Sequence, residues 1–95
     1  QFYTFNLFSD TFKHYAGLLL GQMLKGNSFH KSCSNIDLPS GSRYANETRL
    51  KLLRLNYIMV NPLAKGNANK YLVTDFGKDF LKEYKDNLLQ TYNSL

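Results

Sequence analysis

The stretch that decides the fold, LLRLNYIMVNPLAKGNANKYLVTDFGK, runs from Leu52 to Lys78. Its residues 57–60, Tyr-Ile-Met-Val, form a β-rich run that Pro62 closes, because proline cannot donate a hydrogen bond to a sheet ladder. Residues 71–73, Tyr-Leu-Val, form a second run, and the basic, polar segment between the two is rich in turn-forming residues. This spacing predicts an antiparallel hairpin with a basic tip.

A helix is predicted immediately before the hairpin. Ser40 or Ser42 can cap a helix over about residues 42–55. Asn56 follows it, at the position where a left-handed residue often ends a helix. The inner stripe of this helix is expected to consist of Ala45, Thr48 or Arg49, Leu52 and Leu55, with Leu53 beside it.

A longer helix is predicted immediately after the hairpin. Thr74 supplies a capping hydroxyl and Asp75 an acid in the first turn, so the helix is expected to run over about residues 74–92. Its broad apolar stripe consists of Phe76, Phe80, Leu81, Tyr84, Leu88, Leu89 and Tyr92.

Two further helices are expected nearer the N-terminus. Ser9 caps the first, over about residues 10–25, and Ser28 caps the second, over about residues 29–36. The aromatic segment 1–8 precedes both. Its phenylalanines at positions 2, 5 and 8 suit one side of a helical turn, so we expect them to pack on the domain rather than remain in water. The predicted order is helix, helix, helix, hairpin, helix: one α+β, mostly α domain over residues 1–95.

Composition narrows the class of protein. The 95 residues are 43% apolar, which is a globular value, and a chain of this length builds one core. Cys33 is the only cysteine, so a reducing cytoplasm is the expected compartment, and its thiol is expected to fill a small core position. Neither a membrane span nor a signal peptide is visible. His14, His30 and Cys33 are too few for a metal site, so we expect no metal, no cofactor and no catalytic residues.

The positive charge lies in the middle of the chain. The net charge is +5, and residues 40–73 account for all of it, with six basic residues against the single acid Glu47. The six are Arg43, Arg49, Lys51, Arg54, Lys65 and Lys70. A concentrated positive charge attracts polyanions, although a solvated basic face gives the same count.

The element order and two motifs resemble the winged helix-turn-helix family. The motifs are Leu-Leu-Arg-Leu-Asn-Tyr-Ile over 52–58 and Lys-Tyr-Leu-Val-Thr-Asp-Phe-Gly-Lys over 70–78. The pattern departs from the family at Asn56, where glycine is usual, and at the inserted Val73. Gly77 matches the family's glycine, whose missing Cβ would permit close packing beside the hairpin. The outline is similar to MarR- and PadR-like regulators and to the TubR-type adaptor of plasmid partition systems.

The resemblance implies binding to double-stranded DNA, with the third helix in the major groove. The residues expected to face DNA there are Ser40, Ser42, Arg43, Tyr44, Asn46 and Glu47. Arg43 would pair with guanine and Asn46 with adenine. Glu47 would repel phosphate, so it would either read a cytosine amino group or pair with Arg43 or Lys51, and the pair is favoured. Tyr44 would either pack or touch sugar. Further phosphate contacts are expected from Lys65 and Lys70 on the wing and from His30 and Lys31 on the second helix.

A dimer is expected, because paired half-sites give a small reader its specificity. The surface proposed for it consists of Phe2, Phe5, Phe8, Tyr84, Leu88 and Tyr92, although these side chains would also serve to complete the monomer core. Two roles follow from DNA binding: a transcriptional regulator or a centromere-binding protein in plasmid partition. The alternative is a winged-helix module that contacts a protein in a partition or replication complex.

Overall fold

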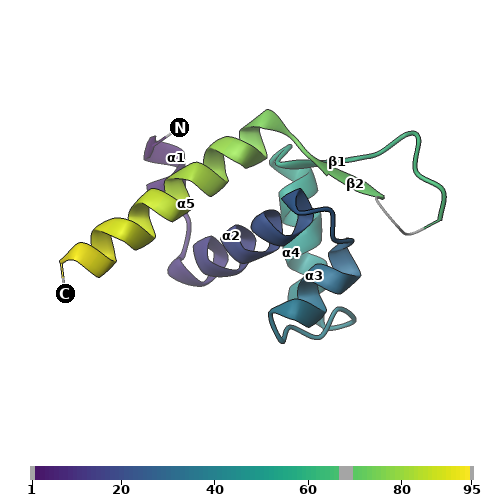
Figure 1. The fold of residues 1–95 in the computed structure, drawn as a ribbon, viewed down its shortest axis with the longest axis horizontal. Helices are drawn as coiled ribbons and strands as arrows, with labels where there is room; N and C mark the ends of the chain where they lie inside the picture. The colour runs from purple at the N-terminus through teal and green to yellow at the C-terminus, as the bar shows by residue number, and fades with distance from the viewer. Residues whose placement is uncertain (1, 67–69, 95) are drawn as a thin grey trace.

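Five helices and one two-stranded hairpin make up the part of the chain that the structure, a computed structural model, describes (Figure 1). It describes residues 2–66 and 70–94, with the backbone alone over 2–4. The elements are α1 (Phe2–Leu7), α2 (Asp10–Leu24), α3 (Phe29–Asn35), α4 (Arg43–Arg54), β1 (Ile58–Val60), β2 (Tyr71–Val73) and α5 (Asp75–Asn93). The domain is therefore α+β and mostly helical, as predicted, and each element after α1 begins and ends within one residue of its expected bounds.

A hydroxyl group caps the start of four of these helices. The side-chain oxygens of Ser9, Ser28, Ser42 and Thr74 each accept a hydrogen bond from the backbone N–H three residues later, at 3.1–3.2 Å. Each cap satisfies one of the N–H groups that have no partner inside the helix. These caps confirm the predicted starts of α2, α3, α4 and α5 and select Ser42, not Ser40, for α4.

The hairpin is tied to the helices on both sides of it. Asn56 adopts a φ of 62°, and the N–H of Tyr57 donates to Leu52 O at 2.9 Å, which closes α4 in a Schellman motif. The carbonyl of Tyr57 then accepts from the N–H of Thr74 at 3.0 Å. A Cβ on Gly77 would collide with that same carbonyl, which confirms the expected close packing there. Antiparallel pairing of Ile58 with Val73 continues the ladder.

The main core surrounds the ring of Phe80, which is 2% exposed. Ring centroids lie 5.1 Å from it for Phe5, 5.2 Å for Tyr57, 5.8 Å for Phe8 and 6.0 Å for Phe12. The aromatic segment before α2 thus packs on the domain, as expected. It does so as a helix, α1, against α5, and the predicted order of four helices did not include this element. Tyr84 also belongs to this core, against Gly17 of α2. Assigning Phe5 and Tyr84 to a dimer surface is therefore wrong, because the monomer buries both side chains.

A second, smaller cluster holds α2, α3 and α4 together. It contains Leu19, Cys33 and Ala45, one residue from each helix, all fully buried. Phe29 packs against both clusters and so joins them. Burial raises the pKa of the Cys33 thiol, which suits the small core position expected for it. This cluster fixes the start of α4, where the candidate site lies.

Candidate nucleic-acid interface

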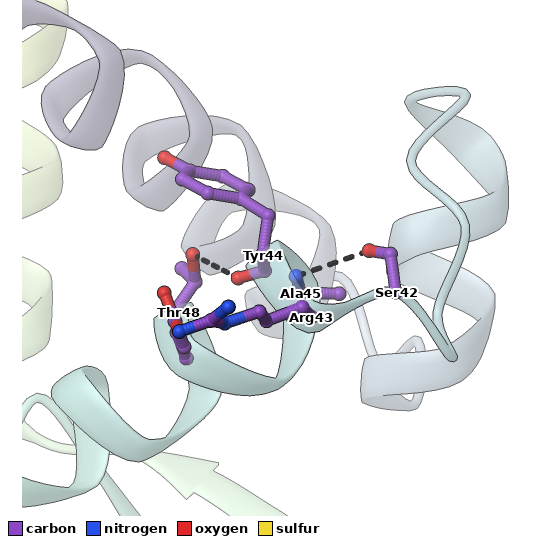
Figure 2. Close-up of polar contacts among 6 residues, drawn as sticks. Ser42, Arg43, Tyr44, Ala45 and Thr48 are labelled. Carbon is purple, nitrogen blue, oxygen red and sulfur yellow. Dashed lines mark hydrogen bonds and ion pairs between the residues drawn. The ribbon is translucent and has the colours of Figure 1, made fainter.

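Helix α4 buries one side and exposes the other. Ala45, Thr48 and Leu52 face the core, and the hydroxyl of Thr48 donates to the carbonyl of Tyr44 at 2.8 Å (Figure 2). Of the two residues considered for the inner stripe, Thr48 occupies it, because Thr48 is buried whereas Arg49 is half-buried. The residues left exposed on α4 are Arg43, Asn46, Glu47, Leu50 and Arg54. Because its apolar side is buried in the core, α4 exposes its mostly polar side to solvent along its length.

Arg43 and Glu47 form an ion pair on the exposed side of α4. Nε of Arg43 donates to Oε1 of Glu47 at 2.8 Å, and the side chains are 92% and 57% exposed. This confirms the expected pairing of Glu47 and identifies Arg43 as its partner. A pair so exposed adds little stability. Because a guanidinium carries five N–H donors, the others stay available to an incoming phosphate or base edge.

Tyr44 packs rather than projects. Its ring centroid lies 5.3 Å from that of Tyr15 on α2, in an edge-to-face arrangement, and the side chain is half-buried. Burial raises the pKa of the Tyr44 phenol. Of the two roles considered from the sequence, packing is therefore the one that the structure supports, and the ring braces the first turn of α4 against α2 (Figure 2).

The segment before α4 is attached to α3. Oγ of Ser40 lies 2.7 Å from Nδ1 of His30, so two residues expected to contact phosphate are brought together. Lys31 is exposed beside them on α3. Ser42, by contrast, uses its oxygen to cap α4, and this occupies one lone pair of the hydroxyl. His30 and Ser40 thus form a small polar pair beside the N-terminus of α4, and Lys31 is exposed on the same helix as His30.

A polar bridge that the sequence did not predict connects α4 to the hairpin. Arg49 donates through Nη2 to Oδ1 of Asn46 at 2.6 Å and through Nη1 to the hydroxyl of Tyr71 at 3.0 Å. The spacing of three between Asn46 and Arg49 is a local signal that makes their contact foreseeable. Nothing local indicates Tyr71, which lies 22 residues further along the chain.

The basic residues of 40–73 do not all lie on one face. Lys51 turns inward, with Nζ 4.2 Å from the ring centroid of Phe12 and 5.2 Å from that of Phe8, so it is a cation–π contact of the core edge. Lys65 and Lys70 are exposed on the connection between the strands, which reaches away from the helices (Figure 1). Of the tip expected at 65–69, residues 67–69 lie outside the described residues.

The surface expected to form a dimer is reduced to the far end of α5. Leu88 and Tyr92 are 50% and 74% exposed, with Leu89 beside them. Phe8 is half-buried among core rings, and the side chain of Phe2 lies outside the described residues. The long apolar stripe predicted for this helix is therefore buried only around Phe80, and its last two turns stand clear of the core.

Comparison with protein-family models, with curated proteins and with solved structures finds no match. Within residues 2–66 and 70–94, no cluster of three or more His, Cys, Asp or Glu side chains is arranged to hold a metal ion. In the same ranges, none of the helices combines the length and the apolar character needed to cross a bilayer. The class of protein defined so far is a small, mostly helical α+β domain that exposes one polar helix face beside a hairpin.

Proposed function

We propose that this chain is a winged helix-turn-helix protein that binds double-stranded DNA. In this proposal α3 and α4 form the helix-turn-helix, α4 enters the major groove, and β1 and β2 form the wing. The observation that carries it is the exposed face of α4: Arg43 and Asn46 project from the first turns while Ala45 and Leu52 anchor the helix from behind. The wing's Lys65 and Lys70 would lie along the backbone or minor groove.

The charge around α4 supports a polyanionic partner. Arg43 and Arg54 are exposed near the two ends of the helix, and Lys31 lies on α3. The free N–H groups and positive dipole end at the start of a helix also favour phosphate. The proposed role is that of a dimeric transcriptional regulator or a centromere-binding protein of a plasmid partition system.

The first prediction concerns salt and charge. If roughly six phosphates are neutralised per subunit, affinity for a duplex should fall about a thousandfold as salt rises from about 50 to about 200 mM. Arg43→Ala should weaken binding about tenfold through loss of a base contact, whereas Lys65→Ala should reduce the salt slope by about one. Glu47→Gln should tighten binding, because it removes a negative charge facing phosphate. Fluorescence anisotropy with duplex from upstream of the chain's own gene measures the salt dependence and the effects of the three variants.

Lys82→Ala on the exposed side of α5 is the matched control, because it removes the same charge far from α4. It should leave both affinity and salt slope unchanged. An equal loss for Lys82→Ala and Arg43→Ala would mean that only net charge matters. No binding at low salt would refute DNA binding itself.

The second prediction concerns the dimer, proposed through the end of α5. Leu88 and Tyr92 are large and exposed, and Leu88 also lines a groove between α2 and α5, together with Gly21 and Leu81. An exposed apolar patch of this kind marks an interaction surface. Leu88→Glu should convert a dimer to a monomer in sedimentation equilibrium, since it would bury a charge. Gln90→Glu, on the opposite side of α5, should not; a wild-type chain that sediments as a monomer would disprove the dimer.

The apolar end of α5 also favours the second candidate function, a module that docks on a different protein. The same residues would then hold a partner chain instead of a second copy. The two candidates separate on the variants of α4 and the wing, because a protein-docking module would not respond to Arg43→Ala or Lys65→Ala.

A further inference from the structure

We propose that Arg49 is a positioning residue that orients the amide of Asn46 and thereby selects which base it reads. This inference rests on the proposed DNA binding and deepens it. The base expected is a guanine, which presents the acceptors O6 and N7 side by side, or a thymine, which presents O4. Adenine, the base expected from the sequence, is less suited, because its N7 acceptor lies beside an amino group that donates.

The orientation of the Asn46 amide follows from the chemistry of its partner. A guanidinium group only donates hydrogen bonds, so the Asn46 atom facing Arg49 Nη2 at 2.6 Å is the oxygen, Oδ1. The nitrogen, Nδ2, then lies on the other branch of the amide. Because Asn46 is exposed, that nitrogen is the group it offers to an incoming base.

A donor at this position changes the expected readout. Recognition of adenine by asparagine needs both amide atoms, with the oxygen accepting from the adenine amino group and the nitrogen donating to N7. The bond from Arg49 takes one of the two lone pairs of Oδ1 and turns that oxygen toward the guanidinium, so in this proposal Oδ1 is poorly placed to accept from adenine as well. The remaining donor matches the O6 and N7 atoms of guanine or the O4 atom of thymine.

Arg49 itself is held in place by the hairpin. Its second nitrogen, Nη1, donates to the hydroxyl of Tyr71 at 3.0 Å, and the side chain is half-buried between α4 and β2. Lys70 lies over the ring of that tyrosine, with Nζ 5.6 Å from its centroid. One guanidinium group is therefore hydrogen-bonded both to the Asn46 amide on α4 and to Tyr71 at the start of β2, and it fixes the position of one relative to the other.

The test selects bound duplexes from a library of random sequence and determines the base preference at each position. It is carried out for wild type and for three variants, Asn46→Asp, Arg49→Lys and Tyr71→Phe. Wild type should enrich guanine or thymine at one position. Asn46→Asp, which replaces the donor by an acceptor, should change that preference to cytosine, whose amino group donates. Arg49→Lys keeps the charge but not the two-armed geometry. It should flatten the preference at that position about tenfold and leave the salt slope unchanged.

Tyr71→Phe is the matched control, because it breaks only the arm to the hairpin and keeps the contact with Asn46. It should preserve the preference for guanine or thymine. A merely structural role for Arg49 would instead weaken binding to all sequences equally. Enrichment of adenine by wild type, or an unchanged preference in Arg49→Lys, would overturn this inference alone. Enrichment of no duplex at low salt would overturn the proposed function, and the inference with it.

Discussion

Replacing Phe80 by alanine is expected to remove about 4 kcal/mol from the free energy of unfolding, the largest loss of any single truncation in this core. The ring is 2% exposed and contacts aromatic rings from α1, α2 and the start of the hairpin. The cavity would therefore be lined by residues of three separate segments, which cannot all move inward together. Urea unfolding followed by circular dichroism measures the loss, which is a large part of the roughly 5–15 kcal/mol typical of a domain.

Phe76→Ala provides the matched control. Phe76 lies one turn earlier on the same helix, and its replacement by alanine is the same chemical change, but its side chain is 50% exposed. The loss should stay below about 1 kcal/mol, because surface truncations leave no cavity. Similar losses for the two variants would show that Phe80 is not the centre of the core.

Gly17→Ala is expected to lower the free energy of unfolding by about 2 kcal/mol. A Cβ at position 17 would collide with the ring of Tyr84, including the ring carbon nearest its own backbone. The ring carbon nearest to that Cβ is Cγ, which a rotation of the side chain barely moves, so relief requires α2 and α5 to separate. This penalty exceeds the gain of up to about 1 kcal/mol that alanine brings to a helix interior.

Gly21→Ala, one turn further along α2, should have the opposite sign. The nearest side-chain atom to a Cβ there is Cδ1 of Leu81 at 3.9 Å, an ordinary van der Waals contact. The helical propensity of alanine then acts alone and should raise the free energy of unfolding by up to about 1 kcal/mol. Thermal melts of the two variants side by side decide the matter: a shift in the same direction for both would contradict the close packing at Gly17.

The elements of the fold could be predicted because their signals are local. Hydroxyl caps at Ser42 and Thr74 act on an N–H three residues away, and Asn56 ends α4 through its own backbone angle. Each signal therefore lies within one helical turn in the sequence. The ion pair of Glu47 with Arg43 was predictable for the same reason, since a spacing of four places two side chains together on a helix.

The side-chain partners that join distant elements could not be predicted in this way. Lys51 counts toward the basic segment, yet it lies over the rings of Phe8 and Phe12, and charge along a chain does not say which side of a helix carries it. The bridge from Arg49 to Tyr71 likewise depends on how the hairpin folds back on α4. The predicted site stays a prediction at Arg43, Lys65 and Lys70, whose contacts with DNA require DNA to be present.

The junction at residues 56–57 has a mechanical consequence. The hydroxyl of Thr74 donates to the carbonyl of Asn56 at 2.5 Å, and its N–H donates to the carbonyl of Tyr57 at 3.0 Å. The residue that caps α5 is thus hydrogen-bonded to the two carbonyl groups that directly follow α4, and these bonds join the end of one helix to the start of the other. We therefore expect α4 and α5 to move together, so that a rotation imposed on the exposed end of α5 also turns α4.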